Sequence, residues 1–304
     1  MNRVLIVGCG YVGFPLGAEL ASQGHEVFGV RRAVPDPEPY EAAGIQPLAA
    51  DITKPEDLAR LPGPFDWVVN LVSSSHGGVE EYRQVYLQGT RNLVNWLKAA
   101  PPQKFVYTSS TGVYGQTDGS LVKEDAPTFP ITETSQVLIE TERALLEAFR
   151  QHKFPAAILR VAGIYGPERG HLFQQYLRKE ARIEGKGERF LNMIHLDDLV
   201  HVIIAALKRG HPGEVYNAVD DEPVTELHFF HWLSETLCQR LPPHGPPADA
   251  AERKRGQTHR RILNRKLKME LGYQFKHPTF RQGYTAEIHR LELAEGLPRP
   301  QRQS

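Results

Sequence analysis

Short apolar runs alternate with amphipathic stretches over much of this chain, a pattern typical of a parallel sheet covered by helices. The run from Val4 to Val7 predicts a buried strand, and residues 14–23 predict a helix that ends at Gly24. Four further strands are predicted in HEVFGV, GIQPLAA, DWVVNLV and KFVYT. A helix with an apolar stripe is expected over 79–99. The predicted fold class is therefore α/β.

The turn between the first strand and the first helix contains the motif GCGYVG. Gly8 suits the tight turn, Gly10 lets the backbone approach a pyrophosphate, and Gly13 lets the helix pack on the strand. The free N–H groups of the helix then face the anion. Tyr11 and Val12 lie within this loop and are predicted to contact the cofactor. A dinucleotide site is predicted, and an ordinary glycine-rich turn is the alternative.

The end of the second predicted strand carries two arginines, Arg31 and Arg32. NAD-binding folds usually place an acidic residue about 20 residues beyond the glycines, where it binds the ribose 2′-hydroxyl. A guanidinium suits a 2′-phosphate instead, so the sequence favours NADP over NAD. A pair of solvated arginines is the alternative. Asp51 and Ile52 are predicted beside the adenine, and Leu71 completes the predicted cofactor site.

The polar loop after the fourth predicted strand, residues 73–78, is expected to face the glycine loop across a crevice where ligands bind. His76 in this loop is a candidate acid or base, although an exposed loop histidine is an equally good interpretation.

The segment TSSTGVYG follows the fifth predicted strand. Together with the glycine loop it resembles the extended and atypical short-chain dehydrogenases/reductases, which include NAD(P)-dependent nucleotide-sugar epimerases and dehydratases. Later segments resemble that family in the same order: LRVAGIYGP, NMIHLDDLVHVIIAAL, GEVYNAVDDEPVT and RRILNRKLKMELGY. The resemblance implies a Rossmann-like, doubly wound parallel sheet with a smaller C-terminal substrate lobe. It also implies a homodimer formed through two helices, one of them 79–99.

This resemblance places the NAD(P)-binding domain at 1–165, with later returns at about 190–220. The substrate lobe is predicted at 166–190 and 221–296, and residues 297–304 are predicted to form a tail.

The family's chemistry, as the resemblance implies, uses a Tyr-x-x-x-Lys pair and an upstream hydroxyl. The lysine lowers the pKa of the phenol, which exchanges a proton with the substrate while hydride moves to or from the nicotinamide. Ser110 matches the upstream hydroxyl, but Thr134 and Leu138 stand at the tyrosine and lysine positions. No tyrosine of the chain has a lysine four residues after it. The pair is therefore predicted to be absent, which typically costs ~10²–10⁴ in rate.

Four residues are candidates to replace the tyrosine, namely Tyr114, His76, Tyr86 and Glu133. Each has a structural alternative: Tyr114 belongs to the VYG turn, and Glu133 complements a helix dipole. Leu138 has the spacing of a packing residue on its helix.

Candidates for holding the diphosphate of a substrate are Asn192, Arg189 and Arg169, with a solvated surface as the alternative. His195 is expected at a helix start, where Asp197 or Asp198 would cap N–H groups. The histidines lack ligand spacing, so no metal site is predicted.

The 304 residues include 36 basic and 36 acidic side chains, so the net charge is +0 and no nucleic-acid or membrane partner is indicated. Two cysteines make no disulfide framework, and no apolar run reaches the ~18 residues of a membrane span. A cytoplasmic protein is expected.

Two functions remain open from the sequence. The first is an NADP-binding, epimerase- or dehydratase-like oxidoreductase with an altered catalytic set, acting on a sugar nucleotide or another small hydroxyl or carbonyl compound. The second is a non-catalytic NADP-binding sensor or scaffold.

Overall fold

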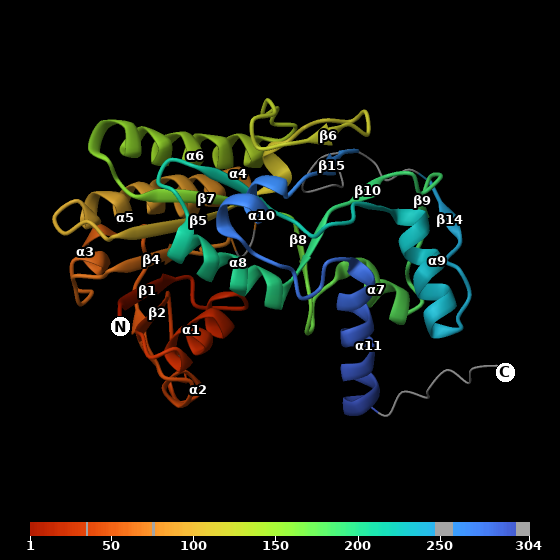
Figure 1. The fold of residues 1–304 in the computed structure, drawn as a ribbon, viewed down its shortest axis with the longest axis horizontal. Coiled ribbons are helices and arrows are strands. Elements are labelled where there is room, and N and C mark those ends of the chain that lie inside the picture. Colours follow the sequence, from red (N-terminus) through yellow and green to blue (C-terminus); the bar gives the residue numbers. More distant parts are fainter. Residues whose placement is uncertain (35, 75–76, 247–257, 296–304) are drawn as a thin grey trace.

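The central element is a seven-stranded parallel sheet, seen in a computed structural model that describes residues 1–34, 36–74, 77–246 and 258–295. The strand order is β12-β7-β5-β4-β1-β2-β3 (Figure 1). The strands are β1 Arg3–Val7, β2 Glu26–Arg31, β3 Ile45–Ala49, β4 Trp67–Asn70, β5 Lys104–Ser110, β7 Ala156–Val161 and β12 Val215–Ala218. The order reverses between β1 and β4, which creates a crevice at their carboxyl ends. The predicted doubly wound fold is confirmed.

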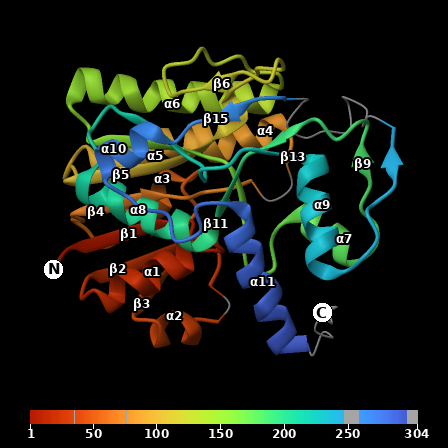
Figure 2. The same cartoon turned by 45° about the vertical axis from the view of Figure 1, so that its right-hand side comes forward.

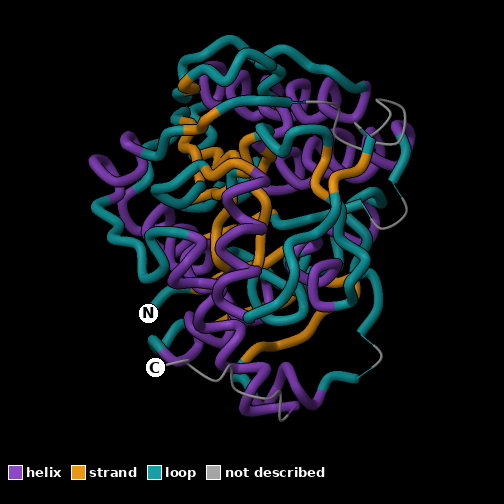
Figure 3. The backbone as a smooth tube through the Cα atoms, turned by 90° about the vertical axis from the view of Figure 1, so that its right-hand side faces the viewer, coloured by secondary structure: helices purple, strands orange, loops and turns teal. Residues whose placement is uncertain are grey.

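Helices cover both faces of this sheet (Figure 3). Alternate residues of β1 serve the two faces: Val4 and Ile6 pack in one cluster, Leu5 and Val7 in another. The first cluster is closed by α1 Gly13–Ser22, α8 Leu196–Arg209 and α10 Arg265–Leu271. The second is closed by α3 Pro55–Leu58, α5 Gly89–Leu97 and α6 Glu133–His152. The strands therefore need apolar residues at nearly every position.

The C-terminal part of the chain builds a smaller lobe beside the carboxyl ends of the strands (Figure 2). Its elements are α7 His171–Leu177, β9 Ile183–Glu184, β10 Phe190–Leu191, β13 Val224–Thr225, α9 Glu226–Leu237, β14 His244–Gly245 and α11 Phe280–Glu295. Aromatic rings fill its core, with Tyr284 contacting Tyr165, Phe173 and Phe229. The predicted tail, 297–304, lies outside the described residues.

Two small parallel pairs connect the lobe to the sheet. β8 Gly163–Tyr165 pairs with β11 Met193–His195, and β6 Leu121–Val122 pairs with β15 Arg261–Ile262. The second pair brings the 258–262 segment against η2, Thr111–Val113, at the end of β5.

The helix predicted over 79–99 is interrupted by a π-helical turn. It runs as α4 Val79–Tyr82, the π-helix η1 Arg83–Gln88, and α5. A Cβ at Gly89 would lie 2.7 Å from Ile52 Cδ1, so the glycine lets this helix approach the loop after β3. π-turns inside α-helices are frequent at functional sites.

The start of α8 differs from the prediction. His195, not an aspartate, is its N-cap: Nδ1 accepts the N–H of Asp197 at 3.1 Å. The Asp198 carboxylate accepts bonds from the Tyr273 hydroxyl at 2.7 Å and from the N–H groups of Lys276 and His277 at 2.7 and 3.0 Å. Asp198 therefore ties the 273–277 segment to α8 and does not cap its own helix.

Within the described part of the chain, none of the helices combines the length and apolarity needed to cross a bilayer.

Candidate active site

The glycine loop has the backbone geometry that a bound pyrophosphate needs. Gly8 has φ +90°, and a Cβ there would lie 2.8 Å from the carbonyl of Leu71. A Cβ at Gly13 would lie 2.6 Å from the Gly8 carbonyl oxygen, whereas one at Gly10 would meet nothing within 4 Å. Gly8 and Gly13 are thus required by packing, and Gly10 leaves open space where a phosphate can approach the backbone.

Tyr11 joins this loop to the C-terminal lobe. Its hydroxyl donates to the carbonyl of Pro167 at 2.8 Å, and the Arg169 guanidinium lies 4.1 Å from its ring centre. Burial raises the pKa of the Tyr11 phenol to about 12. Tyr11, Val12 and Arg169 all line one cavity of about 1440 Å³ that extends from the glycine loop into the lobe.

Arg31 and Arg32 lie at the end of β2 and line the same cavity. The Arg31 guanidinium donates to the Tyr40 hydroxyl at 2.7 Å, which donates to the Cys9 carbonyl at 3.1 Å. This chain of bonds holds the Arg31 side chain beside the glycine loop.

Asp51 and Ile52 line the cavity beyond Arg31. Asp51 Oδ1 accepts the N–H and the hydroxyl of Thr53 at 2.9 and 2.8 Å, and Ile52 is buried against Gly89. The Asp51 carboxylate thus stabilises the turn after β3. Leu71 also lines the cavity, and its N–H donates to the Val7 carbonyl at 2.8 Å.

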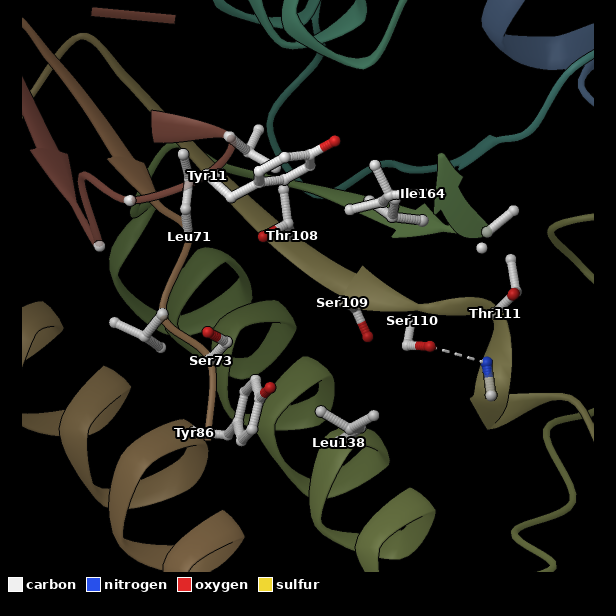
Figure 4. Close-up of a pocket in the computed structure, with 18 of the residues that line it drawn as sticks. Tyr11, Leu71, Ser73, Tyr86, Thr108, Ser109, Ser110, Thr111, Leu138 and Ile164 are labelled. Atoms are coloured by element: carbon white, nitrogen blue, oxygen red, sulfur yellow. Dashed lines mark hydrogen bonds between the residues drawn. The ribbon is translucent and has the colours of Figure 1, made fainter. Parts of the chain in front are cut away.

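Ser110 ends β5 on the opposite wall of the cavity, as Figure 4 shows. Its Oγ accepts the N–H of Gly112 at 3.1 Å, which leaves the hydroxyl proton available for another acceptor. Among the described residues, the Ser110 side chain makes no other hydrogen bond.

Thr134 and Leu138 on α6 also line the cavity, so both predicted dyad positions face it. Thr134 Oγ1 lies 2.9 Å from Thr132 Oγ1. Leu138 is 6 % exposed and packs with Val113 and Tyr114. In Figure 4 the Leu138 and Tyr86 side chains point toward the space in front of Ser110. Tyr86, from the π-helix η1, lines the cavity.

Tyr114 does not reach the cavity, which argues against the catalytic role considered for it. Its ring is fully buried, its hydroxyl accepts from Arg160 at 2.7 Å, and it donates to Asn217 Oδ1 at 2.9 Å. Burial raises the pKa of the phenol, opposed by the charge of Arg160. Tyr114 is therefore a packing residue of the turn.

Of the other candidates, Glu133 is an exposed residue in the first turn of α6 and is not part of the cavity wall. His76 lies outside the described residues.

The residues predicted to hold a diphosphate have different environments. Arg189 Nη2 lies 2.7 Å from Glu226 Oε2, and its Nε lies 3.6 Å from Glu184 Oε2. Asn192 uses its whole amide in the structure, because Nδ2 donates to the Arg260 carbonyl at 3.0 Å and Oδ1 accepts the Ile262 N–H at 2.8 Å. The charge of Arg189 is thus balanced by two glutamates, and the amide of Asn192 holds the backbone of residues 260–262. Both side chains nevertheless border the cavity.

Three buried residues far apart in the sequence, His195, Asp198 and His277, bring metal-ligand atoms within 4.8 Å of one another. No spacing motif in the sequence indicates this group, because its members are far apart in the chain and come together only in the folded structure. Two of its three members are already engaged, because Asp198 accepts three hydrogen bonds and His195 Nδ1 accepts the Asp197 N–H at the start of α8. The Nε2 atom of His277 has no hydrogen-bond partner among the described residues. Desolvation lowers the pKa of His277. The hydrogen bonds of His195 and Asp198 give these two residues a structural role, which is to hold the start of α8 and the 273–277 segment together.

The order and position of these elements agree with comparisons to known proteins. Residues 4–218 match the family model described as "NAD dependent epimerase/dehydratase family". The chain belongs to this family. Protein YeeZ of Escherichia coli (strain K12) is 29% identical over 286 residues, which cover 91% of this chain and 97% of YeeZ.

Solved structures agree with the family assignment. A structure from Methylobacillus flagellatus, assigned to the NAD-dependent epimerases/dehydratases, is 30% identical with a TM-score of 0.76, covering 96% of this chain and 99% of that one. The dTDP-glucose 4,6-dehydratase of Bacillus anthracis, solved with NAD, has a TM-score of 0.82 at 18% identity, covering 97% and 98%. At that identity the likeness shows the fold.

Arg260 lines the cavity but was not among the site residues predicted from the sequence. It lies in a basic stretch that resembles a C-terminal helix approach, and only the β6–β15 pairing brings it to the end of β5.

Proposed function

We propose that this chain is an NAD(P)-dependent oxidoreductase of the epimerase/dehydratase type. Its substrate is a sugar nucleotide or another small molecule with a hydroxyl or carbonyl group. The observation that carries the proposal is that the glycine loop and Ser110 open into one continuous cavity. A dinucleotide on the glycine loop and a substrate at Ser110 would therefore meet inside it.

The chain's own residues supply binding and orientation. The N–H groups at the start of α1 hold the pyrophosphate, and Gly10 leaves the backbone uncovered there. The Ser110 hydroxyl donates to the oxygen of the substrate, because one of its lone pairs accepts the Gly112 N–H while its proton has no acceptor among the described residues. A bound nicotinamide cofactor supplies the hydride acceptor or donor.

The group that exchanges the proton in place of the missing tyrosine is proposed to be Tyr86. Of the four substitutes considered, it is the one that lines the cavity in the described part of the chain. It projects from the π-turn toward the space in front of Ser110 (Figure 4).

NADP is the proposed cofactor. Support comes from Arg31, whose guanidinium is held beside the glycine loop by Tyr40 and suits a 2′-phosphate. The Bacillus anthracis dehydratase was solved with NAD, so NADH is the necessary comparison in any binding experiment.

A second function is supported by Leu138. An apolar side chain stands where the family's lysine is expected, and it is 6 % exposed in the cavity wall. This arrangement suits a protein that binds NADP and reports its state or scaffolds a partner without turning over a substrate.

Titration with NADPH and NADH, followed by turnover assays on a panel of sugar nucleotides, separates these functions. For the enzyme, Ser110→Ala lowers kcat by about 10²-fold, the typical loss of one positioned donor. Ser22→Ala is the matched control, because Ser22 is exposed on α1 and bonds only its own helix. Tight NADPH binding with no turnover on the panel and no Ser110→Ala effect would overturn the proposed enzymatic function and favour the function as a sensor or scaffold.

A further inference from the structure

The wall of the cavity contains a buried cation that makes no ion pair with any of the described residues. The Arg260 side chain is 5 % exposed and lines the cavity together with Ser110 and Thr111. Its Nη2 donates to the Thr111 carbonyl at 2.7 Å. Across the described residues, Nε and Nη1 have no hydrogen-bond partner. Desolvation lowers the pKa of this guanidinium to about 10, and the nearby group that opposes the shift is the Tyr114 phenol.

The neighbouring arginines are engaged in other ways. Arg160 makes a two-pronged pair with Glu142, Arg189 pairs with Glu226, and Arg169 lies over the ring of Tyr11. An unpaired buried charge is unfavourable, so native proteins rarely keep one without a purpose. An anionic ligand in the cavity would supply the negative charge that Arg260 lacks.

The backbone around Arg260 is firmly held. Asn192 bonds the Arg260 carbonyl at 3.0 Å and the Ile262 N–H at 2.8 Å, and β15 pairs in parallel with β6. The guanidinium is also fixed to Thr111, the residue after Ser110. The positive charge of Arg260 is thus held close to Ser110 before any ligand binds.

We propose that Arg260 binds an anionic group of the substrate, a carboxylate or a phosphate, at the end of the cavity next to Ser110. This rests on the proposed function in one respect, that the substrate occupies this cavity. A guanidinium matches the oxygens of either anion, and low surrounding polarity strengthens the attraction. The Ser110 hydroxyl then donates to a neighbouring oxygen of the same molecule. The substrate therefore carries a carboxylate or a phosphate at this end of the cavity.

The first test measures the midpoint temperature of unfolding of the full chain in chloride, phosphate and acetate at equal ionic strength. Phosphate or acetate raises the midpoint of the wild type but not that of Arg260→Gln, which removes the charge. Arg261→Gln is the matched control, since that neighbour is exposed and bonds the Gly119 carbonyl at 2.9 Å. An equal response in all three proteins would overturn the proposal.

A second variant guards against a folding defect. Arg260→Lys keeps the positive charge and loses the planar fork, so it retains part of the anion response. A lower midpoint in every salt for both Arg260 variants, with the anion response intact, would show a structural role and contradict the proposal.

UDP-glucuronate and UDP-glucose distinguish the two sources of negative charge, because they differ by one carboxylate. A tenfold or larger loss of affinity in Arg260→Gln for UDP-glucuronate alone identifies the carboxylate, and an equal loss for both identifies a phosphate. Unchanged affinity for both overturns the proposal. If the wild type binds neither, the phosphate and acetate measurements decide. Failure of the proposed function appears separately, as an absence of NADPH binding.

Discussion

The two ends of the cavity differ in how their polar groups are satisfied. At the cofactor end the wall is largely backbone, closely packed around Gly8 and Gly13, and Arg31 is held by Tyr40. At the substrate end, several buried side-chain atoms of the cavity wall lack a hydrogen-bond partner. Within the described chain these atoms belong to Tyr165, Arg189 and Arg260, whereas the other such atoms, in Tyr107, Gln116, Asp220 and His277, lie outside the cavity wall.

This difference shows where specificity resides. A site made of backbone and glycine accepts any ligand with the right pyrophosphate geometry, so many family members share it. Unpaired buried groups select a particular ligand, because only matching chemistry satisfies them. The substrate end is therefore the part of the cavity where we expect the choice of substrate to be made.

A buried and fully paired arginine that does not line the cavity gives the largest expected effect. Arg160 Nη2 and Nε lie 2.8 and 3.2 Å from Glu142 Oε2, and Ser109 donates to Glu142 Oε1 at 2.5 Å. The carboxylate raises the pKa of the Arg160 guanidinium. Glu142→Gln leaves Arg160 as an uncompensated charge, so we expect a loss of about 3–5 kcal/mol in the free energy of unfolding, measured in urea.

Glu140→Gln is the control for that measurement. Glu140 pairs with Arg83 on the surface at 2.9 Å, and its removal should cost less than about 1 kcal/mol. Similar losses for the two variants would refute the expectation that the buried pair contributes more to stability than the surface pair.

The next largest effect separates two glycines of the cofactor end. Gly8→Ala forces a Cβ against the Leu71 backbone at a φ of +90°, so it should lower the free energy of unfolding by about 1–3 kcal/mol and abolish NADPH binding. Gly10→Ala meets nothing within 4 Å, so it should fold normally yet bind NADPH weakly. Urea unfolding and NADPH fluorescence test the pair. Normal NADPH binding by Gly10→Ala would contradict the phosphate-binding role.

Arg31 tests the selectivity of the cofactor end. Arg31→Gln removes a guanidinium that suits the 2′-phosphate, so NADPH affinity should fall about tenfold, near 1.4 kcal/mol, while NADH affinity stays the same. Arg60→Gln, an exposed arginine paired with Asp57, is the control. Equal changes in the affinities for NADPH and NADH would show that Arg31 does not bind the 2′-phosphate.

A separate, pH-dependent effect concerns Asp220, whose pKa burial raises well above the ordinary 3.8. The folded state then holds the proton more tightly than the unfolded chain. Stability is fully present below about pH 4 and is lost as pH rises toward the folded-state pKa, by less than about 1.4 kcal/mol per pH unit. Asp220→Asn should flatten this decline, measured by thermal unfolding between pH 4 and 8. The exposed Asp125→Asn should not flatten it, and a decline that survives in Asp220→Asn would assign it to another group.

Much of the fold was predictable because its strands are short apolar runs separated by turn residues. The glycine motif and the TSSTGVYG segment indicated the order of elements and the positions of Ser110 and Arg31. The π-turn in η1 was not predictable, because the apolar stripe over 79–99 is equally compatible with an uninterrupted helix.

Contacts between distant residues decide what local context could not predict at the site. The capping role expected of Asp197 or Asp198 was wrong, because His195 caps α8 and Tyr273 engages Asp198. For Tyr114, the hydrogen bond from Arg160 supports the structural alternative. Arg260 was missed because its place in the cavity depends on a strand pair formed with residues about 140 positions earlier. Local motifs therefore predict the cofactor end better than the substrate end.

The most direct measurement of the central claim is a fluorescence titration of the wild type and Gly10→Ala with NADPH, with NADH in parallel. The account predicts saturable binding by the wild type, tighter for NADPH than for NADH, and a marked loss of affinity in a Gly10→Ala protein that unfolds normally. The account is contradicted if the wild type binds neither dinucleotide, or if Gly10→Ala binds NADPH as tightly as the wild type.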